Sequence, residues 1–345
     1  MVASSAEVNL AVDRQALLEQ LLGQLDTLPP ALRADVAEAL AEEGKLLHQP
    51  ASFHDGRWAL LPLCLARELQ SGAEPLFACS ASLAMECVIC ATDLFDDVMD
   101  EDVTPLIERL GMARVLNVAL ALISLAQGML LAPTNAAASL SSPLCLLHAI
   151  QQALLLATAG QQQDLLAERQ RACELQREDC IEMAAAKAGA LLSLACRLGA
   201  ICAGVQEGQI EQCAEMGRLL GIAAQLDNDA HDLSCLLQPV SGSLKSDLKR
   251  GKKTLPVVLA AHSLRESQGM DAREIDRALQ DVASLQGEEQ AIYCGALREG
   301  MLATWGLSLL YRERARDYFP VIPGGRRASA ALYQLLGFDE LLREA

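Results

Sequence analysis

The residues from 78 to 102, ACSASLAMECVICATDLFDDVMDED, join an apolar stretch to a dense cluster of acidic side chains. Six of the last ten positions are Asp or Glu. Asp96 and Asp100 are four residues apart, so on a helix they share one face, near its C-terminal end. Carboxylates placed there repel each other and meet the negative end of the helix dipole. A hard divalent cation such as Mg²⁺ would relieve both effects, whereas the alternative is a solvated acidic helix end.

Helical periodicity extends from this stretch almost to both ends of the chain. The 345 residues are rich in Leu and Ala and only 3% are aromatic, which favours helix over sheet. No strand-like alternation persists for more than a few residues, so the sequence predicts an all-α protein. We expect helices at residues 7–27, 30–48, 56–71, 75–100, 105–131, 142–168, 174–206, 208–235, 254–267, 271–285, 287–318 and 326–343.

The composition excludes several classes of protein. With 52% hydrophobic residues, the chain is too apolar to be disordered. The formal net charge of −17 argues against nucleic acid and against an anionic membrane surface as partners. Nine acidic residues belong to two local clusters, and without them the net charge is −8, that of an ordinary soluble surface. The excess of acidic residues in these two clusters is therefore better explained by a metal site than by repulsion of an anionic ligand.

The sequence predicts neither a targeting signal nor a reactive cysteine. Residues 1–13 have neither the basic nor the apolar region of a signal peptide, and polar residues interrupt every long apolar stretch. We interpret the most apolar of these, residues 113–132, as a buried core helix, and we expect no transmembrane segment. The 12 cysteines are scattered through helical sequence, which suggests reduced thiols in the cytoplasm. For Cys87 and Cys90, core packing is favoured over a zinc or redox site.

A second polar cluster lies inside another apolar helix. The segment from 225 to 232 reads QLDNDAHD. Gln225, Asn228 or Asp229, and Asp232 are spaced as one polar stripe on the helix. A buried stripe of this kind needs partners. Two oxygen-rich clusters on separate helices can hold several Mg²⁺ ions between them.

A third element is a basic loop. The segment from 246 to 256, SDLKRGKKTLP, holds four basic residues, including Lys252 and Lys253, just before a predicted helix. Pro256 suits the first turn of that helix. The segment is either a solvated loop or, beside two metal clusters, a cationic clamp for a phosphorylated ligand.

Together these segments resemble the trans-polyprenyl diphosphate synthase family of the class I isoprenoid synthase superfamily. Residues 96–100 resemble its first DDxxD motif, and Glu86 stands ten positions upstream, where the family usually has Glu. The other similar elements follow in the family's order: Gly160–Leu165 (GQxxDL), Lys187 (the KT element), Gly221–Asp232 (the second acidic motif) and Asp247–Pro256 (GKxTLP).

This resemblance implies an isoprenoid synthase-type helical bundle around a central deep pocket, built from residues 51–345 after an N-terminal helical extension over residues 1–50. It also implies a homodimer that uses Mg²⁺, with three ions the expected number, to release pyrophosphate from a prenyl diphosphate and leave a carbocation. The implied metal-binding residues form two sets: Asp96, Asp97 and Asp100 for two ions, and Asn228, Asp229 and Asp232 for the third.

The resemblance assigns further residues to the substrate. The cations expected to bind the diphosphate are Lys187, Lys252, Lys253 and Arg57. The residues expected to orient metal-bound water are Gln161, Asp164 and Gln225. Ala91 and Thr92 stand where bulky side chains limit product length in the family, and both are small. We therefore expect a pocket for a prenyl chain of C15 to C20 or longer.

The sequence also departs from the chain-elongating members of the family. These members bind isopentenyl diphosphate through a GKRxRP-like segment, a His before the first motif and an Arg-Arg pair after it. Aligning the segment with residues 56–62 leaves only Arg57 basic, while Ile89 and Pro105-Leu106 occupy the other positions. Each charge-assisted contact contributes about 1.5–3 kcal/mol, so losing several would abolish useful affinity.

These departures leave several functions open. The first is a terpene synthase of the polyprenyl-synthase-like type, in which deprotonation, cyclisation or water quenches the cation. The second is a prenyltransferase with another acceptor, such as a peptide Trp. The third is a non-catalytic partner subunit, and the fourth is a chain-elongating polyprenyl diphosphate synthase. Sequence analysis places the terpene synthase first.

Overall fold

The computed structural model describes residues 5–49, 55–70, 77–131, 141–237, 247–319, 322 and 330–336. Within these ranges every regular element is a helix, so the all-α prediction is confirmed. The elements are α1 (Ser5–Leu25), α2 (Pro30–Ala39), α3 (Arg57–Leu69), α4 (Ala78–Met99), α5 (Pro105–Leu110), α6 (Met112–Leu131), α7 (Ser141–Ala167), η1 (Ala172–Glu174), α8 (Arg177–Ala184), η2 (Ala185–Gly189), α9 (Ala190–Ala203), α10 (Glu207–Leu237), α11 (Asp247–Arg250), α12 (Leu255–Gln268), α13 (Ala272–Gln280), α14 (Gly287–Arg316) and α15 (Ala330–Leu335).

Several of the predicted helices are shorter or divided, and the predicted helix 271–285 ends at Gln280. The predicted helix 105–131 is two helices, because Gly111 adopts a φ of 79° and breaks it. The predicted helix 30–48 ends at Ala39, and Gly44, with a φ of 83°, lies in the turns that follow. The predicted helix 174–206 contains η2, a π-helical segment that separates α8 from α9.

The chain forms two compact units. Unit 1 consists of residues 1–152, 194–214 and 318–345, and unit 2 consists of residues 153–193 and 215–317. Three of the four points at which the chain passes between the units lie inside the helices α7, α9 and α10. The predicted domain boundary at residues 50–51 lies outside the described residues, and α1 and α2 belong to unit 1 together with α3 and α4.

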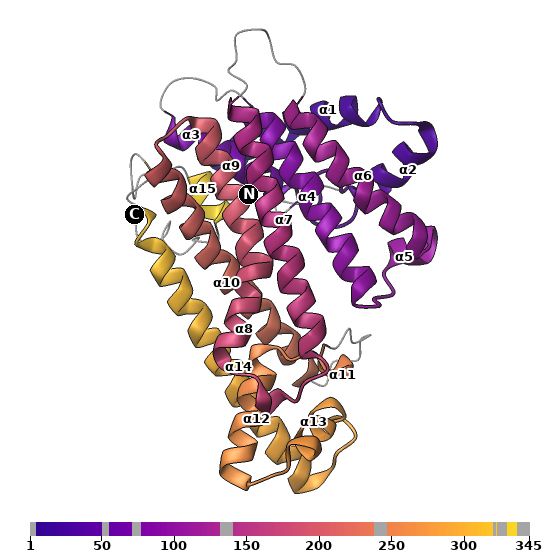
Figure 1. Cartoon of the computed structure of the whole chain (residues 1–345), viewed down its shortest axis with the longest axis vertical. Helices are drawn as coiled ribbons and strands as arrows, with labels where there is room; N and C mark the ends of the chain where they lie inside the picture. The colour runs from indigo at the N-terminus through magenta and orange to yellow at the C-terminus, as the bar shows by residue number, and fades with distance from the viewer. Residues whose placement is uncertain are drawn as a thin grey trace. The chain divides into compact units, whose positions relative to one another are not determined.

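Helix α4 is the core of unit 1. It packs most extensively against α3 and α6, and α1 also contacts it (Figure 1). Its buried residues run almost without interruption from Ala78 to Leu94 and lie on all sides of the helix. This is why the stretch is apolar all round and shows no simple amphipathic pattern. Cys87 and Cys90 are fully buried within it, which confirms the core-packing interpretation.

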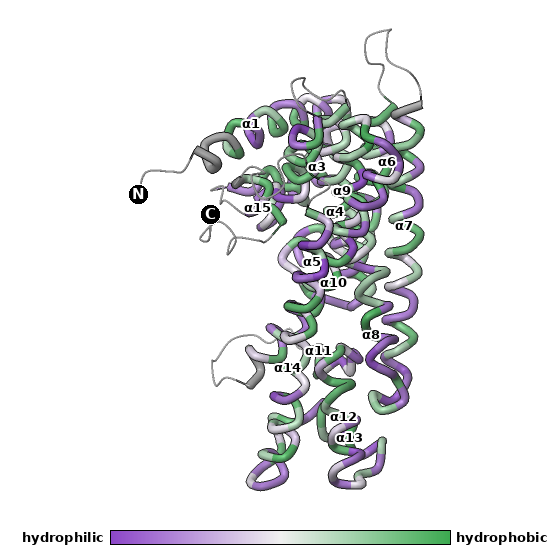
Figure 2. Tube along the Cα trace, turned by 90° about the vertical axis from the view of Figure 1, so that its left-hand side faces the viewer, coloured by the Kyte–Doolittle hydropathy of each residue, from purple (hydrophilic) through white to green (hydrophobic). Residues whose placement is uncertain are grey.

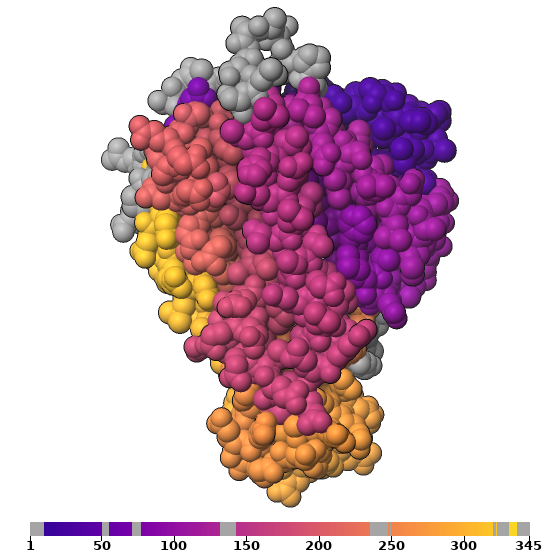
Figure 3. Space-filling model, viewed as in Figure 1, coloured from indigo at the N-terminus to yellow at the C-terminus, as the bar shows by residue number. Residues whose placement is uncertain are grey.

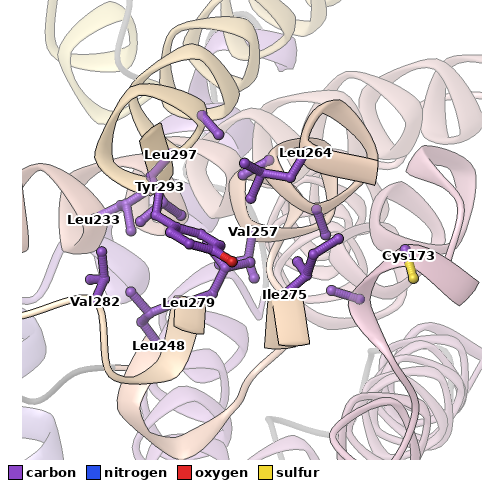
Figure 4. Close-up of a cluster of buried hydrophobic side chains, with 14 residues drawn as sticks. Cys173, Leu233, Leu248, Val257, Leu264, Ile275, Leu279, Val282, Tyr293 and Leu297 are labelled. Atoms are coloured by element: carbon purple, nitrogen blue, oxygen red, sulfur yellow. The ribbon is translucent and has the colours of Figure 1, made fainter. Parts of the chain in front are cut away.

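The core of unit 2 is built around Tyr293 of α14 (Figure 4). The ring is 1% exposed and lies among Leu279, Val257 and Leu297, which come from α13, α12 and α14. Its hydroxyl donates to the Met270 Sδ at 3.4 Å. Helices α12 and α14 pack extensively against each other, and α13 closes the cluster against α12. The cluster fixes the helices that follow the basic loop.

The close contact between α12 and α14 depends on one glycine. A methyl group at Gly300 would clash with the carbonyl oxygen of Pro256 and lie 3.1 Å from its carbonyl carbon. On the same helix, Gly295 and Gly306 have no heavy atom within 4 Å of that position. Gly300 is therefore required by packing, whereas Gly295 and Gly306 are not.

We predict opposite effects of alanine at these three positions. Gly300→Ala should lower the free energy of unfolding by about 1–3 kcal/mol, because the backbone of α12 must move. Gly295→Ala and Gly306→Ala should raise it by up to about 1 kcal/mol each, because alanine favours the helix. Urea denaturation of the three variants measures this, and equal effects at all three positions would contradict the packing.

Some of the apolar sequence lies on the surface. Four helical stretches have the length and composition of a membrane span, namely Ala78–Met99, Met112–Leu131, Pro143–Ala167 and Arg177–Ala203. Contrary to the sequence-based expectation, length and composition alone therefore do not exclude a span. In the structure α4 is mostly buried, while α6 and α7 each expose leucines on one side.

The interpretation of residues 113–132 as a buried core helix is thus correct for only one face of α6. Val115 and Leu122 are buried, whereas Leu120 is 60% exposed. Helix α7 alternates hydrophobic and hydrophilic positions along its length (Figure 2). The helix lies at the surface in Figure 3. Leu155 of α7 is 72% exposed.

Candidate active site

The first acidic cluster begins where the buried part of α4 ends. Asp96, Asp97 and Asp100 are half-buried, and the last buried apolar residue before them is Leu94. Asp100 caps the helix, with its N–H donating to the carbonyl of Asp96 at 2.8 Å. The chain then turns through Glu101, whose φ is 55°. The C-terminal end of the buried helix α4 thus carries carboxylates that are partly open to solvent.

The two residues predicted to set the pocket length lie on the same helix. Ala91 is fully buried, and Thr92 is half-buried with its hydroxyl donating to the Ile89 carbonyl at 3.0 Å. The Thr92 hydroxyl is therefore satisfied by its own helix and adds no polar group to an apolar cavity. Their effect on product length stays a prediction.

A cation that sequence reasoning missed lies beside this cluster. Lys45 is 8% exposed, and its Nζ forms an ion pair with Asp93, one helical turn before Asp96 and Asp97. Burial alone would lower the pKa of Lys45, but the carboxylate of Asp93 raises that pKa above its usual value. Lys45 therefore stays charged at neutral pH. The available signal was a Gly-Lys pair, Gly44-Lys45, inside a segment that we expected to be helical.

Arg57, which sequence reasoning placed on the diphosphate, contacts α15. Its Nε and Nη2 atoms donate to the carbonyl of Leu335 at 3.0 and 2.8 Å. This pairing joins the start of α3 to α15. The role of Arg57 at the diphosphate stays a prediction, and Lys45 is a further cation beside the first acidic cluster.

The other positions expected to carry cations are apolar. Ile89 and Leu106 are each 2% exposed, whereas Pro105 is exposed. Arg109, the first arginine after them, forms ion pairs with Glu38 and Glu42 of the α2 region. Because both partners are near, its charge is already balanced within the protein.

The second acidic cluster lies on α10 in unit 2. The Nε2 of Gln225 donates to the Oδ1 of Asp229 at 2.9 Å, and Asp229 is half-buried. Asn228 and Asp232, four residues apart, are exposed. The helix therefore carries an oxygen-rich stripe that is open to solvent at Asn228 and Asp232.

Asp164 and Lys187, which the resemblance assigned separately to metal-bound water and to the diphosphate, form an ion pair in unit 2. The Nζ of Lys187 lies 2.8 Å from the Oδ2 of Asp164, and both side chains are mostly buried. Burial raises the pKa of the Cys180 thiol to about 12, and the carboxylates of Asp229 and Asp164 contribute. Both carboxylates therefore act electrostatically on the same thiol. Gln161, one helical turn before Asp164, is 6% exposed.

The π-helical segment η2 carries Lys187 and packs against two glycines. A methyl group at Gly160 of α7 would lie 2.8 Å from Ala186 Cβ. A methyl group at Gly221 of α10 would lie 2.7 Å from both Ala188 and Gly189 backbone atoms. Both glycines allow neighbouring helices to approach this segment closely. π-Helical turns are frequent at functional sites because they redirect side chains.

The basic loop is more ordered than a solvated loop. Lys252 and Lys253 are 7% and 4% exposed. The Nζ of Lys253 donates to the Gly251 carbonyl at 2.8 Å, and the Cys180 thiol donates to the Lys253 carbonyl at 3.5 Å. Gly251 has a φ of 83°, which directs the chain into α12. Two ammonium groups are thus held in the same unit as Asp164 and Asp229.

The donor chemistry fits Mg²⁺. The two clusters offer carboxylate and amide oxygens, which are the ligands of this ion. Within the described residues, no group of three or more His, Cys, Asp and Glu side chains is already arranged around a metal position. Each cluster therefore supplies a few oxygens only, and the remaining ligands of an ion would come from water and a phosphorylated substrate.

Comparison with known proteins identifies the family. The family model described as Polyprenyl synthetase matches residues 59–294. The chain belongs to the polyprenyl synthetase family. The matched range includes both acidic clusters, Lys187 and the basic loop, but it begins after Lys45.

Characterised relatives of the polyprenyl synthetase family are similar over most of the chain. A (2E,6E)-farnesyl diphosphate synthase of Mycobacterium tuberculosis is 28% identical over 304 residues, covering 84% of this chain and 81% of the relative. A geranylgeranyl diphosphate synthase of the same organism is 29% identical over 264 residues, covering 71% and 73%.

Solved structures show the same fold. The geranylgeranyl pyrophosphate synthetase of Pyrococcus horikoshii has a TM-score of 0.75 at 20% identity, covering 99% of this chain and 98% of the other. The polyprenyl synthetase of Streptomyces coelicolor has a TM-score of 0.67 at 24% identity, covering 98% of each chain. The chain therefore has the fold of these structures over almost its whole length.

Proposed function

We propose that the protein is a Mg²⁺-dependent prenyl diphosphate synthase that condenses an allylic prenyl diphosphate with isopentenyl diphosphate. Its relatives bear the names of such synthases. The observation that carries the proposal is the buried ammonium of Lys45, which pairs with Asp93 on the helix of the first acidic cluster. It supplies a fixed cation for a second diphosphate, which the sequence alone lacked.

Each residue described above is proposed to have its own role in the reaction. Mg²⁺, when bound, stabilises the negative charge that develops on the departing pyrophosphate. Asp96 and Asp100, backed by Asp97, would hold two ions, and Asn228, Asp229 and Asp232 would hold a third. The C1–O bond of the allylic substrate breaks, the double bond of isopentenyl diphosphate attacks C1, and a proton is lost from the adduct.

The lysines of unit 2 would bind the allylic diphosphate. Lys187 is oriented by Asp164, and Lys252 and Lys253 are held by their burial in the loop before α12. Fixed cations of this kind stabilise the developing charge without reorganisation during the reaction. Gln161 and Gln225 would orient metal-bound water, and the small Ala91 and Thr92 favour a chain of C15 to C20 or longer.

A second candidate function is supported by the apolar positions at Ile89 and Leu106. Both are buried, and Arg109 is already paired with two carboxylates. Fewer cations therefore accompany Lys45 at a second diphosphate than in the chain-elongating members of the family. The candidate is a terpene synthase that ionises one prenyl diphosphate and quenches the cation by deprotonation, cyclisation or water.

The decisive experiment offers the purified protein C10, C15 and C20 diphosphates with Mg²⁺, each with and without isopentenyl diphosphate. Elongated diphosphates formed only when isopentenyl diphosphate is present would support the proposed function. Hydrocarbons or alcohols formed from a single allylic diphosphate would contradict it and support the terpene synthase. A heat-inactivated sample controls for spontaneous solvolysis.

We further propose that the enzyme is a cytoplasmic homodimer. The support for a second copy is the set of leucines that α6 and α7 expose, including Leu116 and Leu120 on one side of α6 and Leu144 on α7. Exposed apolar side chains that gather in a patch favour an interaction site. Light scattering should give about twice the chain mass of 36.9 kDa, whereas a monomer mass would contradict the proposal.

A further inference from the structure

Two buried carboxylates hold the loop that carries Lys45. The N–H of Gly44 donates to the Oδ1 of Asp55 at 2.8 Å, and the N–H of Leu46 donates to the Oε1 of Glu86 at 2.6 Å. Asp55 is 1% exposed and Glu86 is fully buried. The peptide groups on both sides of Lys45 are therefore fixed by charge-assisted hydrogen bonds, which are stronger than bonds between neutral groups.

The loop is also held by close backbone contacts. The N–H of Gly56 donates to the Gly44 carbonyl at 3.1 Å. Gly56 has a φ of 70°, and a methyl group there would lie 2.7 Å from the Cδ1 of Leu46. The side chain of Leu46 is itself fully buried. The backbone of residues 44–46 thus has one well-defined position against residues 55–56.

Burying the Glu86 carboxyl group costs free energy, and packing alone does not explain why this residue is buried. Its second carboxyl oxygen, Oε2, is buried without a hydrogen-bond partner in the described part of the chain. Burial raises the pKa of Glu86, and the Lys45 ammonium and the Leu46 N–H oppose that effect. A buried group left half satisfied in a native structure calls for an explanation, and one such explanation is a functional constraint.

The two carboxylates near Lys45 differ in how easily they can release it. The side chain of Asp93 is 55% exposed, so water can solvate it if the ammonium moves to a phosphate oxygen. Glu86 is fully buried and holds the backbone rather than the ammonium. Asp93 is therefore suited to hold the Lys45 ammonium before substrate binds. Glu86 is suited to fix the backbone next to Lys45, and so the position from which the Lys45 side chain extends.

We propose that Glu86 is a positioning residue for the diphosphate of the second substrate, acting through Lys45. This inference rests on the proposed function, since it names isopentenyl diphosphate as the ligand of the Lys45 ammonium. The essential feature is the length of the Glu86 side chain, because its oxygen must reach the N–H of Leu46 from the middle of α4.

The test compares two conservative variants. Glu86→Gln keeps the length and an acceptor oxygen, whereas Glu86→Asp keeps the charge but loses the reach. We expect Glu86→Asp to raise the KM for isopentenyl diphosphate about tenfold, and Glu86→Gln to raise it by less than about threefold. The KM for the allylic substrate should change by less than about twofold in both. The reverse order of the two variants would overturn the inference.

A double variant separates positioning from a general structural role. Lys45→Met alone should raise the KM for isopentenyl diphosphate by about 10–100-fold, because a charge-assisted contact is lost. Glu86→Asp added to Lys45→Met should then raise it by no more than about twofold, because the cation that Glu86 positions is already gone. Independent, additive effects would overturn the inference.

Wild-type assays distinguish this inference from the proposed function. If the wild-type protein forms no elongated product with isopentenyl diphosphate, the proposed function fails and the inference fails with it. If the wild-type protein elongates and the KM for isopentenyl diphosphate is unchanged in Glu86→Asp, only the inference fails. Circular dichroism of each variant confirms that the helical fold is kept.

Discussion

Replacing Asp96 and Asp100 together with Asn is expected to reduce kcat/KM at least about a thousandfold, because the ions that neutralise the departing pyrophosphate lose their anchoring carboxylates. The substitution keeps the size of both side chains at the end of α4, where they are half-buried, so the fold should not change. Pyrophosphate release at varied Mg²⁺ concentration measures the effect, and a higher Mg²⁺ requirement should accompany the loss.

Glu101 provides the matched control. It follows the same helix, is exposed, and loses the same charge in Glu101→Gln, but its φ of 55° places it in the turn beyond the helix. We expect kcat/KM of Glu101→Gln to remain within about threefold of wild type, since exposed charges contribute little. If the Asp96 and Asp100 variant keeps near wild-type turnover, the metal assignment is wrong.

Gly221→Ala is expected to lower the free energy of unfolding by about 3 kcal/mol, at the upper end for an overpacked site. The added methyl would lie 2.7 Å from backbone atoms of Ala188 and Gly189, and backbone cannot rotate away as a side chain can. Either α10 or the π-helical segment must move. Thermal and urea denaturation measure the loss.

Gly208→Ala on the same helix is the control for Gly221→Ala. Nothing lies within 4 Å of the position that its methyl would take, so stability should stay the same or rise by up to about 1 kcal/mol. Because Lys187 belongs to the displaced segment, Gly221→Ala should also raise the KM for the allylic diphosphate. Wild-type stability in Gly221→Ala would show that the segment adapts without cost.

The sequence predicted the long helices well, because their signal is local. The apolar run before Asp96 predicted residues 75–100, and the structure has α4 at Ala78–Met99. The second cluster predicted 208–235, and the structure has α10 at Glu207–Leu237. Local periodicity did not predict the π-helical turn at Ala185–Gly189, because that turn depends on close packing against glycines far away in the sequence.

The candidate site was predicted in part. The resemblance placed Lys187 at the diphosphate and Asp164 at metal-bound water, and the structure adds that these two side chains pair with each other. Lys45 was missed because its contact with Asp93 spans 48 residues and cannot be found from residue spacing. Without Lys45, the aligned segment at residues 56–62 offered only Arg57, and Ile89 and Pro105-Leu106 stood at the other positions expected to carry cations. These departures placed the terpene synthase first, whereas the relatives fit the chain-elongating alternative better.

The way the chain alternates between its two units also has a genetic consequence. Unit 1 takes three separate segments of the chain and unit 2 takes two, with three of the crossings inside α7, α9 and α10. No single stretch of coding sequence therefore encodes either unit. A gene fusion, a truncation or a recombination event with its breakpoint inside residues 153–317 would divide both units at once. The acidic cluster of α4 and that of α10 belong to different units, and a breakpoint between residues 100 and 225 would separate them.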